Sequence, residues 1–274
     1  MYPTIREVHR AAWRSGIIND GIRFVPEEVP VAMTYNGGSQ AVMMATPQDL
    51  EDFAIGFSLN EGLVEDLAEI EDLEITHLDE GIELRMWLAK PATARLITRR
   101  RLLAGPTGCG LCGIDSISEA IRPVSRVASG NQFDASQIMA ALASMTEFQR
   151  INIVTRAVHA AAFWSPRNGI ELVREDVGRH NAIDKLGGAL ARAARSADTG
   201  ILLLTSRVSV EMVQKAAMTG ASVPVSISAP TALAVRTAEE AGITLVAVAR
   251  EDGFEIFTNG HRIAGITPHD GIAD

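Results

Sequence analysis

The stretch from residue 201 to residue 250, ILLLTSRVSVEMVQKAAMTGASVPVSISAPTALAVRTAEEAGITLVAVAR, decides the fold. Short apolar runs rich in branched side chains are typical of buried strands, and they are Ile201–Thr205, Val223–Ser228 and Thr244–Ala249. Between them, Val210–Gly220 and Ala232–Gly242 have helical periodicity and end at glycine. This alternation predicts a mostly parallel sheet with helices on its faces.

The alternation of strand and helix patterns continues on both sides of this stretch. We expect a helix from Gly178 to Arg195 and further strands at Ala157–Trp164, Ile170–Arg174 and Phe254–Thr258. The capping-box pattern Ser116-Ile117-Ser118-Glu119 predicts the start of another helix. The second half of the chain is therefore predicted to be one α/β domain.

The first half predicts a smaller α+β domain. After Pro26, alternating apolar residues and a Gly37-Gly38 turn indicate a hairpin whose second strand runs from Ser39 to Ala45. Thr46-Pro47-Gln48-Asp49 predicts a helix start, with the helix ending near Gly62. Further short strands are expected at Ile70–Leu78, Ile82–Leu88 and Ala94–Thr98.

These patterns divide the chain into four parts. We predict an N-terminal extension at residues 1–25, the α+β domain at 26–104, a glycine-rich loop at 105–115 and the α/β domain at 116–274. The loop lies at the domain junction, which is a common place for a pocket.

Polar segments follow the predicted strands of the second domain, where ligands of open α/β sheets collect. They begin at Glu175, Thr205, Ser228 and Arg250. Their backbone amides and side chains would suit an anionic, nucleotide-like ligand, and the candidate binding residues are His180, Ser206, Arg207, Ser228 and Arg250. The alternative is structural, with Asp176 and Ser209 as helix caps and Arg207 as a solvated charge.

Both cysteines of the chain lie in Gly105-Pro106-Thr107-Gly108-Cys109-Gly110-Leu111-Cys112-Gly113. A structural zinc site needs about four ligands, and the six histidines form no second cluster with metal-ligand spacing. A thioredoxin-like dithiol usually starts a helix directly, whereas glycines flank both thiols here. A third interpretation is a nucleophilic cysteine that carries sulfur as a persulfide, activated by a helix N-terminus or by Arg99–Arg101.

The composition narrows the class of protein. The chain has 274 residues, 47% of them hydrophobic and 22% charged, as in a soluble globular protein. The net charge of −9 argues against nucleic acid as a partner. No apolar run reaches the roughly 18 residues of a membrane span, and the N-terminus lacks a signal-peptide pattern, so we expect no membrane partner and a cytoplasmic location.

Several motifs resemble the formate dehydrogenase accessory sulfurtransferase family. The second half contributes the thiol segment Gly108–Gly113, the run Glu175–Lys185, Thr205-Ser206-Arg207 and Ser226–Thr231. The first half contributes Glu28-Val29-Pro30 and Thr46–Phe57. The resemblance covers nearly the whole chain from about Pro26 to Thr258, and motifs this long are more specific than C-x-x-C alone.

The resemblance implies a sulfurtransferase required for formate dehydrogenase activity. Such a protein takes sulfur from a cysteine desulfurase as a cysteine persulfide and passes it to the molybdenum (or tungsten) bis-pterin guanine dinucleotide cofactor, its bound substrate, before insertion into formate dehydrogenase. By motif, Cys109 is the persulfide carrier and Cys112 an auxiliary thiol. The implied cofactor-binding stretch is Val248, Ala249, Arg250, Glu251, Asp252 and Gly253.

The resemblance also implies that the second domain has a three-layer, cytidine-deaminase-like fold. Zinc deaminases carry H-x-E followed by P-C-x-x-C, and neither half of that signature is present, so we expect no deaminase activity and no intrinsic metal.

Two other functions remain open from the residues. A dithiol oxidoreductase would form a stable Cys109–Cys112 disulfide, and a non-catalytic chaperone would bind the guanine-nucleotide cofactor without using Cys109. A homodimer would be a natural way to enlarge the cleft between the domains.

Overall fold

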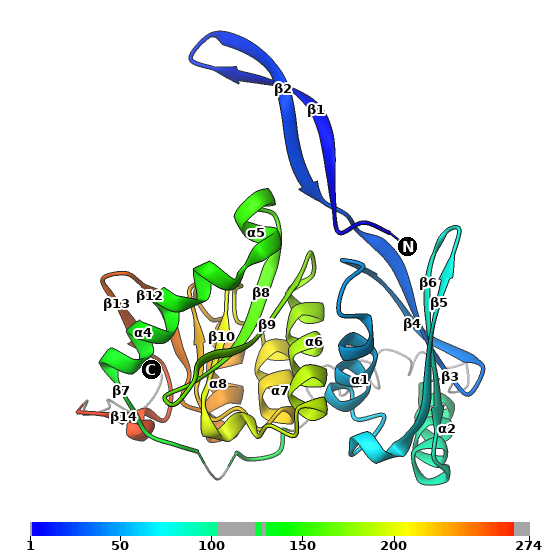
Figure 1. The fold of residues 1–274 in the computed structure, drawn as a ribbon. Helices are drawn as coiled ribbons and strands as arrows, with labels where there is room; N and C mark the ends of the chain where they lie inside the picture. The colour runs from blue at the N-terminus through cyan, green and yellow to red at the C-terminus, as the bar shows by residue number, and fades with distance from the viewer. Residues whose placement is uncertain (1, 104–123, 128–129, 266–274) are drawn as a thin grey trace, which may run out of the picture.

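Two units lie side by side in the structure, and a long hairpin projects above them (Figure 1). The structure is a computed structural model that describes residues 2–103, 124–127 and 130–265. The predicted thiol loop at 105–115 and the helix start at Ser116 lie outside the described residues. The four-part division of the chain therefore stays a prediction.

A six-stranded sheet forms the centre of the C-terminal unit, in the order β13-β12-β11-β10-β8-β9. The predicted strands are present, with these bounds: β8 (His159–Ser165), β9 (Gly169–Asp176), β10 (Ile201–Leu204), β11 (Pro224–Ser226), β12 (Val246–Arg250) and β13 (Gly253–Ile256).

The prediction of a mostly parallel sheet is wrong. Only β10–β11 and β11–β12 are parallel, whereas β10–β8, β8–β9 and β12–β13 are antiparallel. The cause is local, because two short turns join β8 to β9 and β12 to β13 as hairpins with no crossover helix.

Helices cover both faces of this sheet. Leu202 and Leu204 of β10 belong to the core under α6 (Arg179–Arg192), α7 (Val210–Met218) and α8 (Ala232–Glu240). Ile201 and Leu203 point to the opposite face and pack with α4 (Ala135–Met145). Side chains alternate along a strand, so a strand buried on both faces reads as a continuous apolar run. The unit thus has three layers.

The smaller elements of the C-terminal unit lie around this sheet. They are α5 (Arg150–Thr155), the two-stranded pair β7 (Phe133–Asp134) and β14 (Ile263–Ala264), and the 3-10 helices η2 (Thr146–Phe148), η3 (Ala197–Thr199) and η4 (Gly260–Arg262).

The N-terminal unit is a four-stranded sheet in the order β4-β3-β6-β5, packed on α1 (Leu50–Asn60). Its strands are β3 (Val29–Tyr35), β4 (Gly38–Ala45), β5 (Ile70–Leu78) and β6 (Gly81–Leu88), and η1 (Leu67–Glu69) precedes β5. The predicted β3–β4 hairpin is confirmed. The helix begins at Leu50 and not at Thr46, whose polar groups are used elsewhere.

The predicted strand Ala94–Thr98 is wrong, because these residues lie inside the helix α2 (Lys90–Leu103). Ala92 and Leu96 are buried one helical turn apart, and Pro91 lies in the first turn, where a missing N–H costs nothing.

The predicted N-terminal extension forms a hairpin of β1 (Ile5–Arg14) and β2 (Ile17–Pro26), for which no strands were predicted. None of the helices in the described part of the chain is long and apolar enough to cross a membrane.

Candidate functional site

Four strands of the six-stranded sheet end at one edge. Strand β8 is antiparallel to both β9 and β10, so β9, β10, β11 and β12 all run in the same direction. We call the edge where they end, at Asp176, Leu204, Ser226 and Arg250, the carboxyl edge. The predicted binding segments begin at or just after these ends, as their sequence patterns predicted.

A cavity of about 560 Å³ lies at the β12 end of the carboxyl edge. Ala249, Arg250 and Glu251 line it, and they belong to the stretch predicted to bind the cofactor. Ile227, three residues of α4 and the first residue of η2 supply the remaining wall, which is largely apolar: Met139, Leu142, Ala143 and Thr146. A mostly apolar cavity of this size with a few charged groups is typical of a small-molecule site.

Val248, which directly precedes the cavity residues Ala249–Glu251, has an unusual backbone conformation. Its φ of 51° lies in the left-handed region, which is unusual for a β-branched residue, and it sits at a β-bulge between Ala247 and Arg250. Its N–H donates to the Ser228 carbonyl at 3.2 Å. Backbone strain of this kind clusters at functional sites. Glu251 and Asp252 form the tight turn that follows, and Gly253 begins β13.

Hydrogen bonds of the Ser226 hydroxyl group connect the segments in the middle of the carboxyl edge. Ser226 Oγ donates to the Ser206 carbonyl at 2.6 Å, and Ser228 N–H donates to Ser226 Oγ at 3.2 Å. Ser206 is buried while Arg207 is exposed, and neither lines the cavity. Of these predicted residues, Arg207 alone has a solvent-exposed side chain.

His180 lies at the opposite end of the carboxyl edge. Its Nε2 is 2.9 Å from a carboxylate oxygen of Glu211, at the start of α7. Burial lowers the pKa of His180, against the opposing effect of Glu211. Four strand spacings separate the ends of β9 and β12, roughly 19 Å in all, so His180 and Arg250 do not share one small pocket.

Two further polar atoms near α6 and α7 are buried without a hydrogen-bond partner among the described residues. They are Nε of Arg179, in the first turn of α6, and Oγ of Ser209, which precedes α7. Buried polar atoms are nearly always bonded, so these two indicate that something polar completes the edge.

Helices α1 and α6 join the two units at a backbone contact. A Cβ atom on Gly56 would lie 1.7 Å from the Asp184 carbonyl oxygen, and one on Gly188 would lie 1.9 Å from the Asp52 carbonyl oxygen. No side chain fits at either position, so glycine is required at both for the helices to approach this closely.

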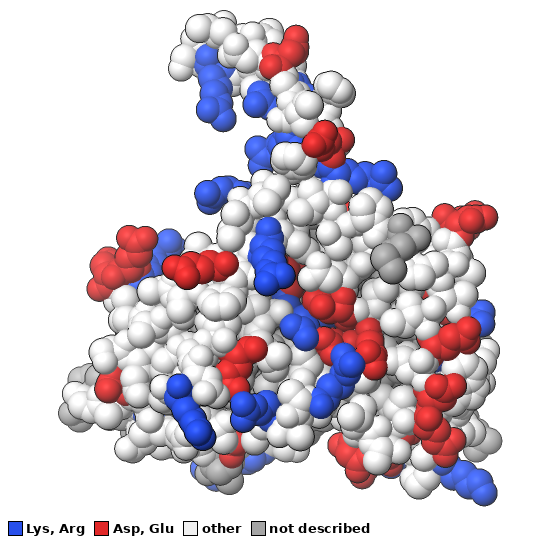
Figure 2. Space-filling model, viewed as in Figure 1, with Lys and Arg blue, Asp and Glu red and all other residues white. Residues whose placement is uncertain are grey.

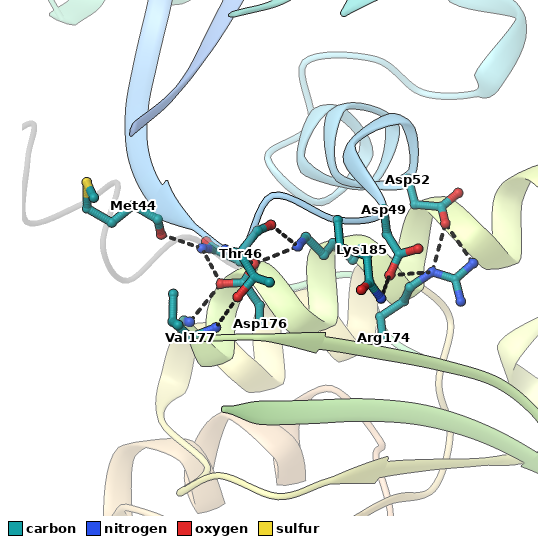
Figure 3. A network of polar contacts seen from close by, with 11 residues as sticks. Met44, Thr46, Asp49, Asp52, Arg174, Asp176, Val177 and Lys185 are labelled. Atoms are coloured by element: carbon teal, nitrogen blue, oxygen red, sulfur yellow. Dashed lines mark hydrogen bonds and ion pairs between the residues drawn. The ribbon is translucent and has the colours of Figure 1, made fainter. Parts of the chain in front are cut away.

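A buried ion pair lies beside this crossing (Figure 3). Lys185 Nζ is 2.6 Å from Asp176 Oδ2 and donates to the Thr46 carbonyl at 2.9 Å, and both charged side chains are 0% exposed. Asp176 also accepts hydrogen bonds from the backbone N–H groups of Thr46 and Gly178 and from the side-chain amide of Asn181. These hydrogen bonds, together with the ion pair, offset the free-energy cost of removing both charges from water.

Asp52 of α1 forms a second polar contact between the units. It lies 2.7 Å from Arg174 and 2.8 Å from Arg192. In Figure 2, acidic and basic side chains gather along this junction.

Lys215 of α7 forms the third contact, 2.9 Å from both Asp184 and Glu61. Burial opposes its charge, but the two carboxylates prevail and raise the pKa of Lys215.

The run Glu175–Lys185 therefore has a different main use from the predicted one. Asp176, Asn181, Asp184 and Lys185 face the other unit and hold it, and only the start of α6 remains at the carboxyl edge. The signal was present in the sequence, because Asp184 and Lys185 lie among the apolar positions of the helix, where a charge needs a buried partner.

The predicted catalytic residues Cys109 and Cys112 lie outside the described residues. Among the residues that the structure does describe, no group of three or more His, Cys, Asp and Glu could hold a metal ion.

Comparisons with known proteins relate the chain to one family. The model of the FdhD/NarQ family matches residues 26–264. Sulfur carrier protein FdhD of Agrobacterium fabrum is 51% identical, covering 94% of this chain and 96% of that protein. The protein of the same name from Brucella abortus is 54% identical over the same shares. A formate dehydrogenase accessory protein from Desulfotalea psychrophila has the same fold, with a TM-score of 0.73 and 24% identity, covering 95% of this chain and 100% of that one.

Proposed function

This chain belongs to the FdhD/NarQ family, and we propose that it is a sulfurtransferase that serves formate dehydrogenase. The observation that carries the proposal is its 51–54% identity, over nearly its whole length, to proteins named as sulfur carriers. The chain also has the thiol pair such a carrier would use, in Gly108-Cys109-Gly110-Leu111-Cys112-Gly113.

In the proposed loading step, the Cys109 thiolate attacks the outer sulfur of a persulfide on a cysteine desulfurase. The S–S bond of the donor breaks, the donor cysteine leaves as a thiolate, and a new S–S bond forms on Cys109. One sulfur atom changes partners, and no external oxidant or reductant is needed.

The proposed acceptor is the molybdenum (or tungsten) bis-pterin guanine dinucleotide cofactor, bound as substrate along the carboxyl edge. This substrate is long and carries two nucleotide ends, which suits an edge whose charged groups are spread over roughly 19 Å. The unpartnered atoms of Arg179 and Ser209 support a polar ligand there.

Within this proposal, the cavity beside β12 takes a guanine. The apolar wall of α4 and Ile227 suits the face of the base, and Arg250 suits the phosphates. Glu251 would repel phosphate, but its carboxylate accepts two hydrogen bonds side by side, which matches the N1–H and amino group of guanine. This pairing accounts for the presence of an acidic residue in a site that binds a nucleotide.

The nucleotide site is tested by titrating GDP, IDP and ADP into the purified protein. We expect the affinity to fall in that order, because IDP lacks the amino group and ADP presents no matching donors. Glu251→Gln should weaken GDP at least about tenfold, since its amide places a donor against a donor. The readout is the dissociation constant by calorimetry.

The control is Glu255→Gln, which removes the same charge from an exposed residue that does not line the cavity. It should leave GDP binding unchanged. An equal loss in both variants would mean that overall charge, and not recognition of guanine, controls binding.

The proposal also includes a cytidine-deaminase-like fold for the C-terminal unit, a cysteine desulfurase as the sulfur donor and a cytoplasmic location for this protein.

A further inference from the structure

Strand β9 lies at one edge of the six-stranded sheet, where it pairs only with β8. An edge strand presents a row of unpaired backbone N–H and C=O groups, which natural proteins usually cover, shorten or protect with charge. We call the side of β9 that faces away from β8 the free edge. Its backbone groups must find hydrogen-bond partners outside the sheet.

Hydrogen bonds on the other side of β8 show which residues of β9 point outward. Both backbone groups of Ala160 are used toward β10, because its N–H donates to Thr205 Oγ1 at 2.8 Å and its carbonyl accepts from the Thr205 N–H at 3.1 Å. Glu175 is opposite Ala160, so its own N–H and carbonyl face away from β8. The same holds for Val173, two residues earlier, and Arg174 Nη1 accordingly donates to the Val173 carbonyl at 2.7 Å.

The N–H groups on the free edge are only partly bonded. Val177, the next residue of this set, donates its N–H to Thr46 Oγ1 of the N-terminal unit at 3.1 Å. The N–H groups of Val173 and Glu175 have no acceptor among the residues that the structure describes. Glu175 is only 4% exposed, and buried backbone donors are nearly always paired, so the free edge is incomplete without a further acceptor.

A cavity of about 460 Å³ lies along the free edge, distinct from the one beside β12. Strand β9 lines it with Val173 and Glu175 among others. Two more segments, one from each unit, complete the lining: Gln48 and Asp49 before α1, and Phe148 and Arg150 at the turn from η2 to α5. An added strand would lie about 4.8 Å from β9, within this cavity.

Glu175 also fixes the wall on the α5 side. Its carboxylate accepts hydrogen bonds from the N–H groups of Ile151 and Asn152, both at 2.8 Å. These bonds hold the start of α5 beside β9, so the cavity is built into the fold.

The two sides of the cavity differ in chemistry. On the α5 side, Phe148 is 46% exposed, and Arg150 has no ion pair with a described residue. On the α1 side, Gln48 donates to Asp49 at 3.1 Å, and Arg174 points toward α1 beside Asp49 (Figure 3). Side chains of an extended segment would alternate between these sides, with apolar or acidic ones facing α5 and polar or basic ones facing Asp49.

We propose that an extended segment of formate dehydrogenase adds to the free edge of β9 as a further strand of the sheet. In this mode of recognition, backbone hydrogen bonds supply affinity and alternate side chains supply specificity. The N–H groups of Val173 and Glu175 donate to carbonyls of the segment, and Phe148 covers one of its apolar side chains. The choice of partner rests on the proposed function, in which formate dehydrogenase is the client.

The spacing and charge of the free edge favour a strand of another protein. Val173 and Glu175 lie two residues apart, about 6.8 Å, which is the repeat at which a second strand presents its carbonyl groups. A second copy of β9 would bring its own Arg150 and Arg174 near these, and like charges across a strand pair repel.

Val173→Pro tests the backbone contact directly. The Val173 N–H faces away from β8, so proline removes the outward donor and no bond of the ladder to β8. In biolayer interferometry with immobilised formate dehydrogenase that lacks its cofactor, we expect this variant to raise the dissociation constant at least about tenfold. Val173→Ala is the matched control, because it shortens the same side chain and keeps the N–H, and it should raise the constant by less than about threefold.

Hydrogen exchange on the wild type gives a second measurement that needs no variant. In the complex with formate dehydrogenase, the amides of Val173 and Glu175 should exchange at least about tenfold more slowly than in the free protein. The amide of Arg174 faces β8 and should change little. If Val173→Pro does not fold, this measurement decides.

Sulfur loading separates this inference from the proposed function. Val173→Pro should gain one sulfur atom from the desulfurase like the wild type, because only the contact with the client is lost. A wild type that loads sulfur but does not bind formate dehydrogenase would overturn the inference and leave the sulfurtransferase intact. Equal binding by Val173→Pro, or unchanged exchange of both amides in the complex, would also overturn it. Protection of both amides that grows with the concentration of the free protein would assign the edge to a second copy and contradict the choice of partner.

Discussion

Gly188→Ala should lower the free energy of unfolding by at least about 3 kcal/mol, and the apparent Tm by roughly 6–12 °C. The added methyl group would lie 1.9 Å from the carbonyl oxygen of Asp52 and 2.7 Å from its carbon. These are backbone atoms of the facing helix and cannot rotate away, so α1 and α6 must separate. Differential scanning fluorimetry and urea unfolding measure the loss.

Gly187→Ala is the control for this prediction. A methyl group there would meet only side-chain atoms of Asn60 and Thr219, at 3.2 Å. Those side-chain atoms need to shift by only a few tenths of an ångström, and alanine favours a helix over glycine by about 0.5–1 kcal/mol, so this variant should destabilise far less than Gly188→Ala. Equal destabilisation by both substitutions would show that helix propensity or solvation, and not the crossing, controls stability.

Separation of α1 and α6 should also affect the site. The crossing positions the unit that precedes the thiol loop against the unit that carries the carboxyl edge, and Asp52, Lys185 and Lys215 all contact residues across the same junction. We therefore expect Gly188→Ala to lower client formate dehydrogenase activity even at a temperature where it stays folded.

Cys109→Ala should abolish support of formate dehydrogenase altogether. In a strain that lacks its own copy of the protein, the wild type should restore formate oxidation and Cys109→Ala should not, because no other thiol is proposed to receive the sulfur. Cys112→Ala should retain measurable activity. Equal protein levels by immunoblot are the control.

The other outcomes identify the competing functions. Full support by Cys109→Ala would make the protein a cofactor chaperone that binds without carrying sulfur. Equal loss in both cysteine variants, together with reduction of insulin by the wild type, would indicate a dithiol oxidoreductase.

Much of the architecture follows from the pattern of apolar residues. The strands around Ile201 and Val223 and the helices between them appear as predicted, because a strand buried on both faces has a continuous apolar signature. The direction of a strand has no such signature, so β8 and β13 were placed in a parallel sheet although short turns make them antiparallel. The predicted strand Ala94–Thr98 was wrong because a short apolar segment is compatible with both the helical and the strand periodicity.

The site was predicted in part for a similar reason. The rule that ligands collect at strand ends selected Arg250 and Glu251, which line a cavity, and their role in binding stays a prediction. It also selected Asp176, which is buried and bonded across the two units. Which partner a charge finds depends on tertiary packing, and Thr46, which bonds both Asp176 and Lys185, lies 130 positions before Asp176 in the chain. The β1–β2 hairpin was missed because nearly all of its side chains are exposed, so its strands lack the alternation of apolar and polar residues that a half-buried strand shows.

Intact mass after loading tests the central claim most directly. The protein is incubated with a cysteine desulfurase and cysteine, separated from both, and weighed before and after treatment with a thiol reductant. We predict that the wild type and Cys112→Ala gain the mass of one sulfur atom, which the reductant removes, and that Cys109→Ala gains none. A reducible sulfur that persists on Cys109→Ala would contradict the account, because the carrier would then be another residue.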